Sequence, residues 1–209
     1  MVNSSIVTQY FSGLNKDQLE KFERLDDLYG YWNAQINVIS RKDIDNLMVH
    51  HVLHSLSIAR VINFARGTKI MDVGTGGGFP GIPLAIMFPQ CQFTLVESVA
   101  KKAKVCGEVA RSLGLDNVEV LNMRAEALSA SFDFVVSRAV ATIPQLMEWV
   151  EKNIHSGGMN QLPNGLICLK GGSFSDELKP YRKFAQTWRV SNFFDDEYFE
   201  EKYIIYIQV

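Results

Sequence analysis

The stretch that decides the fold is Lys69–Gly81, with the sequence KIMDVGTGGGFPG. It begins as an apolar run and ends in a cluster of glycines, and a second short apolar run further along the chain ends at Glu97. This order predicts a β-strand, a tight backbone turn, a crossover helix and a second strand that ends in a carboxylate. Such a unit holds an adenosine-containing cofactor at the C-terminal end of a parallel sheet.

The composition is that of an ordinary globular protein. The chain has 209 residues, of which 47% are hydrophobic and 21% are charged, so it is long enough for one α/β domain with a complete core. The net charge of −2 gives no overall basic signal for nucleic acid, although a local basic patch is sufficient for docking. No run approaches the roughly 20 apolar residues that a membrane span needs.

The cysteines and the N-terminus predict a cytoplasmic protein. Cys91, Cys106 and Cys168 are odd in number and form no C-x-x-C pair, which is typical of buried, reduced thiols. The first residues lack a basic segment followed by an apolar one, so we expect no signal peptide.

Residues 1–66 predict a helical cap that belongs to the same domain as the core, residues 67–209. Apolar residues recur in this first section at three- and four-residue spacing, which is the helical period. We expect a break at Gly30 and a further helix from Ile44 to about Phe64, with Asp43 as its N-cap.

From residue 69 onward, short apolar runs alternate with amphipathic stretches, which predicts a mainly parallel sheet with helices on both faces. Two late β-rich runs, 187–194 and 203–209, predict an antiparallel hairpin that closes one edge. Together these elements form a Rossmann-like, seven-stranded sheet with the outline of class I S-adenosylmethionine-dependent methyltransferases. The expected earlier strands are 69–73, 92–97, 118–121, 132–137 and 165–170, and the helices between them are 82–88, 99–113, 142–154 and 174–184.

The glycine loop fits two cofactors. Residues 72–76, DVGTG, fit the acidic signature of a methyltransferase, whereas residues 76–81, GGGFPG, with Glu97 further along, fit the dinucleotide fingerprint. A dinucleotide places its pyrophosphate at the helix N-terminus, where the carboxylate of Asp72 is unfavourable. S-adenosylmethionine carries a sulfonium and an ammonium instead, so Asp72 favours the methyl donor, acting directly or through the loop and water.

Two further segments extend the expected cofactor site. Glu97 ends the second strand, where a carboxylate accepts hydrogen bonds from both ribose hydroxyls. Residues Arg124, Ala125 and Glu126 follow the third strand, in the loop that flanks the adenine ring in this fold. The loop itself contributes Asp72, Gly74, Gly76, Gly78 and Phe79.

Six motifs of this chain closely resemble the glucose-inhibited division protein B family, which comprises guanine-N7 methyltransferases of small-subunit ribosomal RNA. The resemblance runs from about Tyr29 to about Gly172, and the GFPGIP form of the loop is much more specific than a bare G-x-G. The motifs are WNAQINVIS (32–40), HHVLHS (50–55), DVGTGGGFPGIPLAI (72–86), FTLVES (93–98), RAE (124–126) and FDFVVSRAVA (132–141).

The resemblance implies S-adenosylmethionine as cofactor, with contacts at Gly74, Phe79, Ala125, Glu126 and Arg138 and with Glu97 at the ribose. It also implies 16S ribosomal RNA, in the small subunit or an assembly intermediate, as the partner. The chain departs from the family in one place. Many members have R-H-x-L-D-S where this chain has HHVLHS, so histidines stand at 50 and 54 in place of a basic and an acidic residue.

The chemistry of guanine N7 agrees with what the sequence lacks. N7 carries an exposed lone pair and loses no proton before attack, so the enzyme must align it with the sulfonium and needs no general base. Ser137-Arg138-Ala139 follows the fourth strand, where an Asn-Pro-Pro-Tyr loop would orient an exocyclic amine. Arg138 is the expected positioning residue, for guanine O6, an RNA phosphate or the cofactor carboxylate.

The expected RNA contacts are basic residues near the active edge: Lys101, Lys102, Arg124 and Lys170. His50 and His54 are four residues apart, as metal ligands can be, but no third ligand is apparent and we expect no metal.

The sequence therefore predicts a monomeric cytoplasmic enzyme that methylates N7 of a specific guanine in 16S ribosomal RNA. Three alternatives remain: an S-adenosylmethionine-dependent methyltransferase for another substrate, a nicotinamide-dependent oxidoreductase, and a non-catalytic RNA-binding module.

Overall fold

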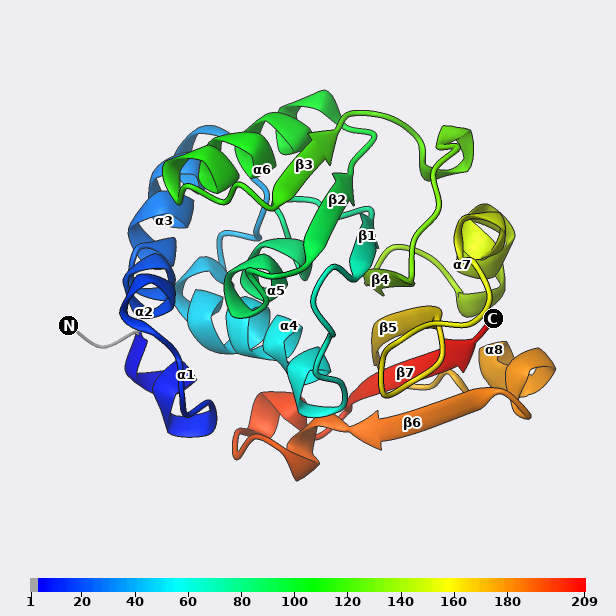
Figure 1. The fold of residues 1–209 in the computed structure, drawn as a ribbon. Coiled ribbons are helices and arrows are strands. Elements are labelled where there is room, and N and C mark those ends of the chain that lie inside the picture. The colour runs from blue at the N-terminus through cyan, green and yellow to red at the C-terminus, as the bar shows by residue number, and fades with distance from the viewer. Residues whose placement is uncertain (1–3) are drawn as a thin grey trace.

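The computed structural model describes residues 4–209, and the side chains from Ile6 onward. Its centre is a seven-stranded sheet in the order β3-β2-β1-β4-β5-β7-β6 (Figure 1). All neighbours up to β5 are parallel, whereas β7 runs antiparallel to both β5 and β6. The predicted sheet with its C-terminal antiparallel hairpin is confirmed. The strands are β1 Lys69–Val73, β2 Gln92–Val96, β3 Val118–Leu121, β4 Phe134–Arg138, β5 Gly165–Gly171, β6 Ala185–Arg189 and β7 Lys202–Gln208.

The register aligns the strand ends that carry the loops. Val73 at the end of β1 pairs with Val96 of β2 on one side and with Ser137 of β4 on the other. Ser137 in turn pairs with Cys168 of β5. The loops after these parallel strands therefore leave the sheet at one edge, which is where open α/β sheets bind ligands.

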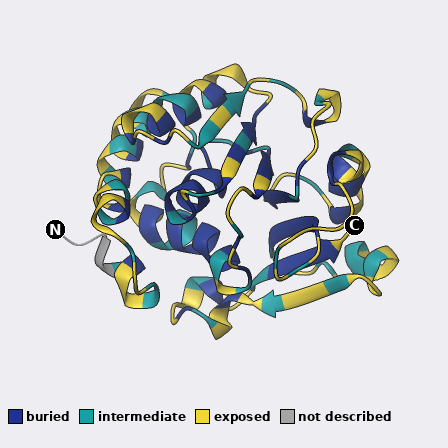
Figure 2. Ribbon diagram, in the orientation of Figure 1, coloured by how far each residue is buried: buried dark blue, intermediate teal, exposed yellow. Residues whose placement is uncertain are grey.

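Helices cover both faces of the sheet, and β1 shows how its two faces are used. Ile70 belongs to a core that includes Phe22 and Leu25 from the N-terminal helices, whereas Met71 belongs to a second core with Leu146 of α7. Successive side chains of a strand point to opposite faces, and the strands are accordingly buried on both (Figure 2). The helices are α1 Ser4–Tyr10, α2 Lys16–Glu23, α3 Leu25–Gln35, α4 His54–Leu56, α5 Gly81–Met87, α6 Ala100–Ser112, α7 Ile143–Val150 and α8 Ser175–Leu178.

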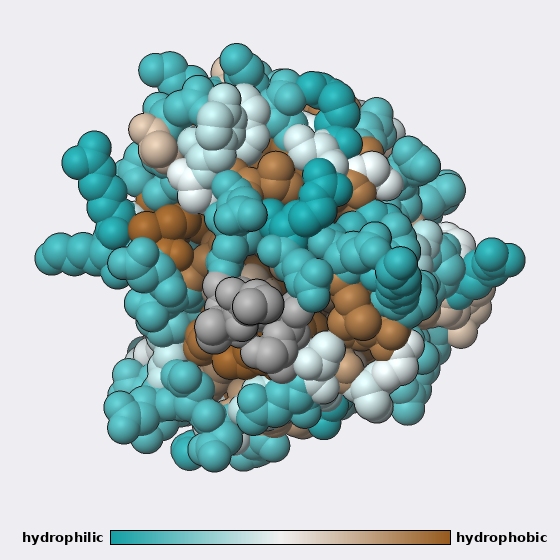
Figure 3. Space-filling model, turned by 90° about the vertical axis from the view of Figure 1, so that its left-hand side faces the viewer, coloured by the Kyte–Doolittle hydropathy of each residue, from teal (hydrophilic) through white to brown (hydrophobic). Residues whose placement is uncertain are grey.

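The N-terminal helices share one core with the sheet. Val7, Phe22 and Tyr29 are fully buried in the same cluster as Leu95 and Val136. The outer surface on this side of the molecule is mostly hydrophilic, with small separate apolar areas (Figure 3). These helices therefore turn an apolar stripe inward and a polar face to solvent.

Three local predictions were wrong. Gly30 does not break a helix but lies within α3, because one glycine costs only about 1 kcal/mol in a helix whose apolar side is buried. The predicted helix 44–64 is instead a 3₁₀ turn, a π-helix at Leu47–Leu53, the short α4, and a 3₁₀ helix that ends at Arg60. The predicted strand 187–194 ends at Arg189 and continues as a 3₁₀ turn.

Within residues 4–209, no helix combines the length and the apolar character needed to cross a membrane. The three cysteines are buried and form no disulfide, in agreement with the expectation of core thiols.

Gly81 and Gly107 offer a matched test of the packing under the glycine loop. A Cβ at Gly81 would overlap the side chain of Leu95 and lie 2.8 Å from Oδ2 of Asp72, whereas a Cβ at Gly107, within α6, meets nothing within 4 Å. We expect Gly81→Ala to lower the free energy of unfolding by about 1–3 kcal/mol through overpacking. We expect Gly107→Ala to raise it by about 0.5–1 kcal/mol through reduced chain entropy. Urea unfolding measures both, and equal effects of the two substitutions would contradict this packing.

Candidate functional site

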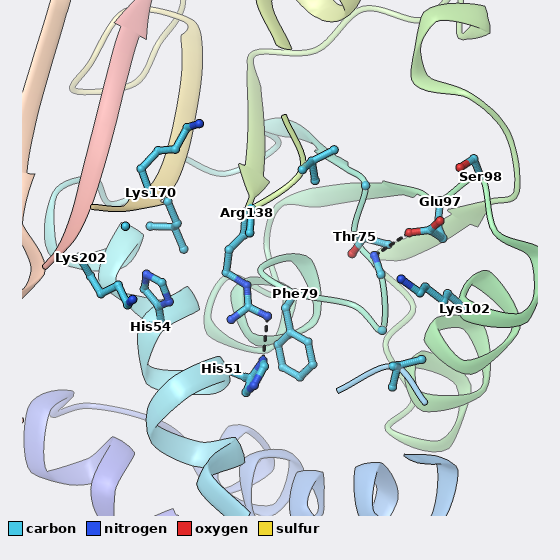
Figure 4. A pocket seen from close by; sticks show the side chains of 18 of the residues that line it. His51, His54, Thr75, Phe79, Glu97, Ser98, Lys102, Arg138, Lys170 and Lys202 are labelled. Carbon is cyan, nitrogen blue, oxygen red and sulfur yellow. Dashed lines mark hydrogen bonds between the residues drawn. The ribbon is translucent and has the colours of Figure 1, made fainter. Parts of the chain in front are cut away.

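A pocket of about 510 Å³ lies at the C-terminal edge of the sheet, with Arg138 near its middle (Figure 4). Two groups of residues line it. The first, called here the loop half, comes from the glycine loop, the end of β2 and α6: Gly74, Thr75, Gly76, Gly77, Glu97, Ser98 and Lys102. The second, called here the histidine half, comes from the segment before β1 and from the C-terminal strands: His51, His54, Leu169, Lys170, Gly171, Tyr198 and Lys202.

The backbone is tightly constrained where the loop meets the end of β4. Gly74 has a φ of 65°, and a Cβ there would lie only 2.5 Å from Cγ2 of Val140, so no other residue fits without a shift. Ala139 has a φ of 54° although it is not glycine. Conformations of this kind cost free energy and cluster at binding and catalytic sites.

Asp72 shapes the loop from beneath and does not line the pocket. Its side chain is fully buried, and its Oδ2 accepts hydrogen bonds from Thr75 Oγ1 at 2.6 Å and from the Gly81 amide at 2.7 Å. Burial raises the pKa of Asp72 to about 7. In this structure Asp72 therefore contributes to the site through the loop.

Glu97 does line the pocket and also ties down the loop. Its Oε2 accepts from the Gly76 amide at 2.9 Å and its Oε1 from the Val99 amide at 2.7 Å. Each carboxylate oxygen has more than one acceptor site. Both oxygens can therefore still accept hydrogen bonds from a ligand in the loop half.

A smaller hollow of about 100 Å³ adjoins the loop half. It shares Gly74, Ser98 and Val140 with the main pocket and also contains the predicted Ala125 and Glu126. Its other lining residues are Val73, Val96, Met123, Arg124 and Trp149. An apolar slot with a few polar groups suits a flat heteroaromatic ring.

Arg138 is a buried cation with neutral partners. Its guanidinium donates to the His50 carbonyl at 3.1 Å and to Nδ1 of His51 at 2.9 Å, and its central carbon lies 5.1 Å from the centre of the Phe79 ring. Burial lowers the pKa of Arg138. Among the described residues no carboxylate forms an ion pair with it, so part of its donor capacity is available to a ligand.

His51 holds this guanidinium in place. A guanidinium can only donate, so Nδ1 of His51 is the acceptor and Nε2 carries the proton, which it donates to Asp43 Oδ2 at 2.6 Å. Burial and the nearby Arg138 charge lower the pKa of His51 to about 4. Asp43 was predicted to be an N-cap, which is wrong, because its side chain makes no cap bond and binds His50 and His51 instead.

Phe79 connects the pocket to the N-terminal helices. Its ring lies 4.7 Å from Tyr29 and 5.3 Å from His51, measured between ring centres. The Tyr29 hydroxyl donates to the Gly77 carbonyl at 2.7 Å. Helix α3 thus fixes both the backbone of the loop and the aromatic wall of the site.

The predicted RNA-binding residues occupy different environments. Lys102 lines the loop half, Arg124 lines the small hollow, and Lys101 is exposed and lines neither. Lys170 also lines the pocket, but its ammonium donates to Glu177 at 2.8 Å and to the Ala141 carbonyl at 2.9 Å.

Sequence reasoning missed two residues of the histidine half. Tyr198 stacks on His50 with ring centres 3.7 Å apart, and the ammonium of Lys202 lies 4.7 Å from the centre of the Tyr198 ring. Both come from the acidic turn and strand near the C-terminus, where no motif marks them. No group of three or more His, Cys, Asp or Glu suited to a metal ion occurs within residues 4–209.

Comparison with known proteins gives one consistent result. The model of the family described as rRNA small subunit methyltransferase G (GidB) matches residues 18–196. Proteins called ribosomal RNA small subunit methyltransferase G from Porphyromonas gingivalis and Bacteroides thetaiotaomicron are 53% and 52% identical. The alignments cover 98% of this chain in both cases and 93% and 99% of the relatives.

Solved structures of lower identity share the fold. A SAM-dependent O-methyltransferase from Thermotoga maritima aligns with a TM-score of 0.56 at 15% identity, over 80% of this chain and 70% of that one. A SAM-dependent methyltransferase from Aquifex aeolicus aligns with a TM-score of 0.54 at 16% identity, over 81% and 98%. The predicted class I methyltransferase fold is confirmed.

The pKa of Asp72 predicts a specific pH dependence of stability. Because the pKa is raised from 3.8 to about 7, the folded state retains a proton that the unfolded chain has lost, and this stabilisation decreases as pH rises from about 4 through 7. Asp72→Asn retains an oxygen for Thr75 and Gly81 but cannot titrate. We expect the free energy of unfolding of the wild type, relative to Asp72→Asn, to fall by up to about 1.4 kcal/mol per pH unit over this range. Urea unfolding at several pH values measures it, and parallel curves for the two proteins would contradict the raised pKa.

Proposed function

Because the chain belongs to the rRNA small subunit methyltransferase G family, we propose that it transfers a methyl group from S-adenosylmethionine to N7 of a specific guanine in 16S ribosomal RNA. The observation that carries this proposal is the division of the pocket. A cofactor-type loop half meets, across Arg138, a histidine half that offers hydrogen-bond donors and no carboxylate among its described residues.

The loop half fits S-adenosylmethionine. Glu97 has acceptor capacity for the ribose hydroxyls, and the adjoining hollow with Ala125 and Glu126 fits the adenine ring. The loop of Gly74, Gly76 and Gly78, held by Asp72, allows close approach to the backbone. When bound, this cofactor supplies an electrophilic methyl group on a sulfonium sulfur.

The start of α5 does not favour a dinucleotide. A pyrophosphate needs free amides at a helix N-terminus, but the Gly81 amide donates to Asp72 and the Ile82 amide donates to the Gly78 carbonyl. The next residue, Pro83, has no amide hydrogen. The amides that would bind phosphate are therefore already engaged, which weighs against a nicotinamide-dependent oxidoreductase.

Arg138 is the positioning residue of the proposed reaction. It lies between the two halves of the pocket, and Asp43 and His51 fix its orientation. A guanidinium has five N–H donors, and two of them are used by His50 and His51. The remaining donors suit guanine O6, an RNA phosphate or the cofactor carboxylate.

The histidine half suits a nucleophile that loses no proton. His51 is neutral but donates to Asp43 and accepts from Arg138, so neither of its nitrogens is available as a base. Lys170 is paired with Glu177. Guanine N7 attacks through an existing lone pair, so alignment is sufficient. An exocyclic amine would need a group that accepts its proton, which makes another methylation substrate the second choice.

The RNA would dock on cations that surround the pocket. Lys102 and Lys202 line opposite halves (Figure 4), and Arg124 lies at the adenine hollow. Phosphate contacts of this kind weaken as salt rises. The proposal takes the protein to act as a cytoplasmic monomer on the small subunit or an assembly intermediate.

Ribosomal RNA from cells that lack the gene tests this function. We expect one guanine of 16S ribosomal RNA to lack its N7 methyl group in those cells. Purified protein with S-adenosylmethionine should restore it on isolated small subunits or their RNA, as read by reverse-transcription stops after chemical cleavage at 7-methylguanine. Normal N7 methylation throughout 16S ribosomal RNA in these cells would refute the proposal.

Glu97 provides a separate test of the cofactor site. We expect Glu97→Ala to weaken binding of S-adenosylhomocysteine by about tenfold or more, because hydrogen bonds to a charged group contribute roughly 1.5–3 kcal/mol. Glu119→Ala is the matched control, because Glu119 is exposed on β3 and lines neither pocket. Isothermal titration calorimetry measures both. Unchanged affinity in Glu97→Ala would place Glu97 outside the ribose site.

A further inference from the structure

The ring of His54 is buried without a hydrogen-bond partner. His54 is the first residue of α4, is 4% exposed and lines the histidine half of the pocket (Figure 4). Neither Nδ1 nor Nε2 has a partner in the part of the chain that the structure describes. Buried polar groups are nearly always satisfied, because leaving one without a partner costs folding free energy.

The neighbouring polar side chains show that this is particular to His54. His50 and His51 both bind Asp43, Ser55 donates to the His51 carbonyl, and Ser57 donates to the carbonyl of His54 itself. This segment therefore satisfies its other polar side chains internally. The one imidazole it leaves without a partner is the one that is buried against the pocket.

The surroundings determine what His54 can bind. Burial, together with the positive charges of Arg138 and Lys202, holds the pKa of His54 well below its usual value. The neutral ring has one donor and one acceptor. The rings of Tyr198 and Phe199 pack around it at 5.7 and 6.0 Å between centres, and neither packs face to face. They support the imidazole by packing alone.

We propose that His54 is a specificity-determining residue that donates a hydrogen bond to O6 of the target guanine. This inference rests on the proposed function. Guanine presents O6 beside N7 as a second acceptor on the same edge, whereas adenine presents an amino group there. Arg138 and Lys202 can only donate, so the ligand edge that fits this wall is rich in acceptors. The N–H of His54 then meets O6 while the N7 lone pair stays free to attack.

Stability and activity should respond in opposite directions. His54→Phe retains the aromatic packing against Tyr198 and Phe199 and removes two polar atoms that lack partners, so the folded protein should be at least as stable as the wild type. The same change removes the donor for O6, so kcat/KM on small-subunit RNA should fall by about tenfold. A residue with a purely structural role would show no such opposition.

The experiment compares the wild type with His54→Phe, His54→Gln and the control His155→Phe. His155 is half exposed, with 51% of its side chain accessible, and lines neither half of the pocket. We measure urea midpoints, S-adenosylhomocysteine affinity by calorimetry, and methylation kinetics on small subunits that lack the modification. The expected result for His54→Phe is an unchanged or higher midpoint, unchanged cofactor affinity and lower kcat/KM. His54→Gln, which retains a donor, should recover part of the activity, and His155→Phe should match the wild type.

The outcomes separate this inference from the function it rests on. An active wild type with an equally active His54→Phe would refute the role of His54 alone. So would equal losses of activity in His54→Phe and His54→Gln accompanied by weaker cofactor binding, because that pattern indicates a structural role. A wild type that methylates no guanine in the small subunit would refute the proposed function, and the inference with it.

Discussion

The buried carboxylate of Asp72 is the contact on which the site depends. One of its oxygens holds Thr75 at the start of the glycine loop and Gly81 at the start of α5. These two bonds close the loop over the end of β1, so that Gly76 can reach Glu97. The loop cannot satisfy its own backbone through regular structure, and a buried acceptor supplies what a strand or helix would otherwise provide. The acidic residue of the motif is therefore an internal support of the loop, and the carboxylate that the pocket presents to a ligand is Glu97.

The N-terminal helices are part of the active edge as well as a cover for the sheet. Tyr29 in α3 holds the Gly77 carbonyl and packs on Phe79, and Phe79 in turn packs on His51 and faces Arg138. Because well-packed side chains move together, the position of Arg138 depends on contacts from three separate segments of the chain. The π-helix at Leu47–Leu53 contributes the histidines to this cluster, and such irregular turns are common where side chains must be directed into a site.

The sequence predicted the sheet and the loop half well, because both are encoded locally. A strand of five residues, its glycine turn and the carboxylate of the next strand lie close together in sequence, and their spacing follows from the parallel crossover. The histidine half was not predictable in this way. Asp43, His51, Tyr198 and Lys202 come from segments up to about 160 residues apart, and their relation depends on tertiary packing. Even the local expectation for Asp43 failed, because its carboxylate has better partners in two histidines than in the backbone of a helix start.

Two imidazoles of the histidine half are kept neutral by different means. His51 is neutral because Arg138 donates to one of its nitrogens, whereas His54 is neutral because it is buried beside two cations. Methylation at N7 leaves the guanine ring with a positive charge. A protonated histidine beside Arg138 and Lys202 would oppose that charge at the distance of a direct contact, where electrostatic interactions in a partly buried site are strongest. Neutral imidazoles can donate a hydrogen bond without adding to this repulsion, and that is the property a guanine-N7 site requires of its histidines.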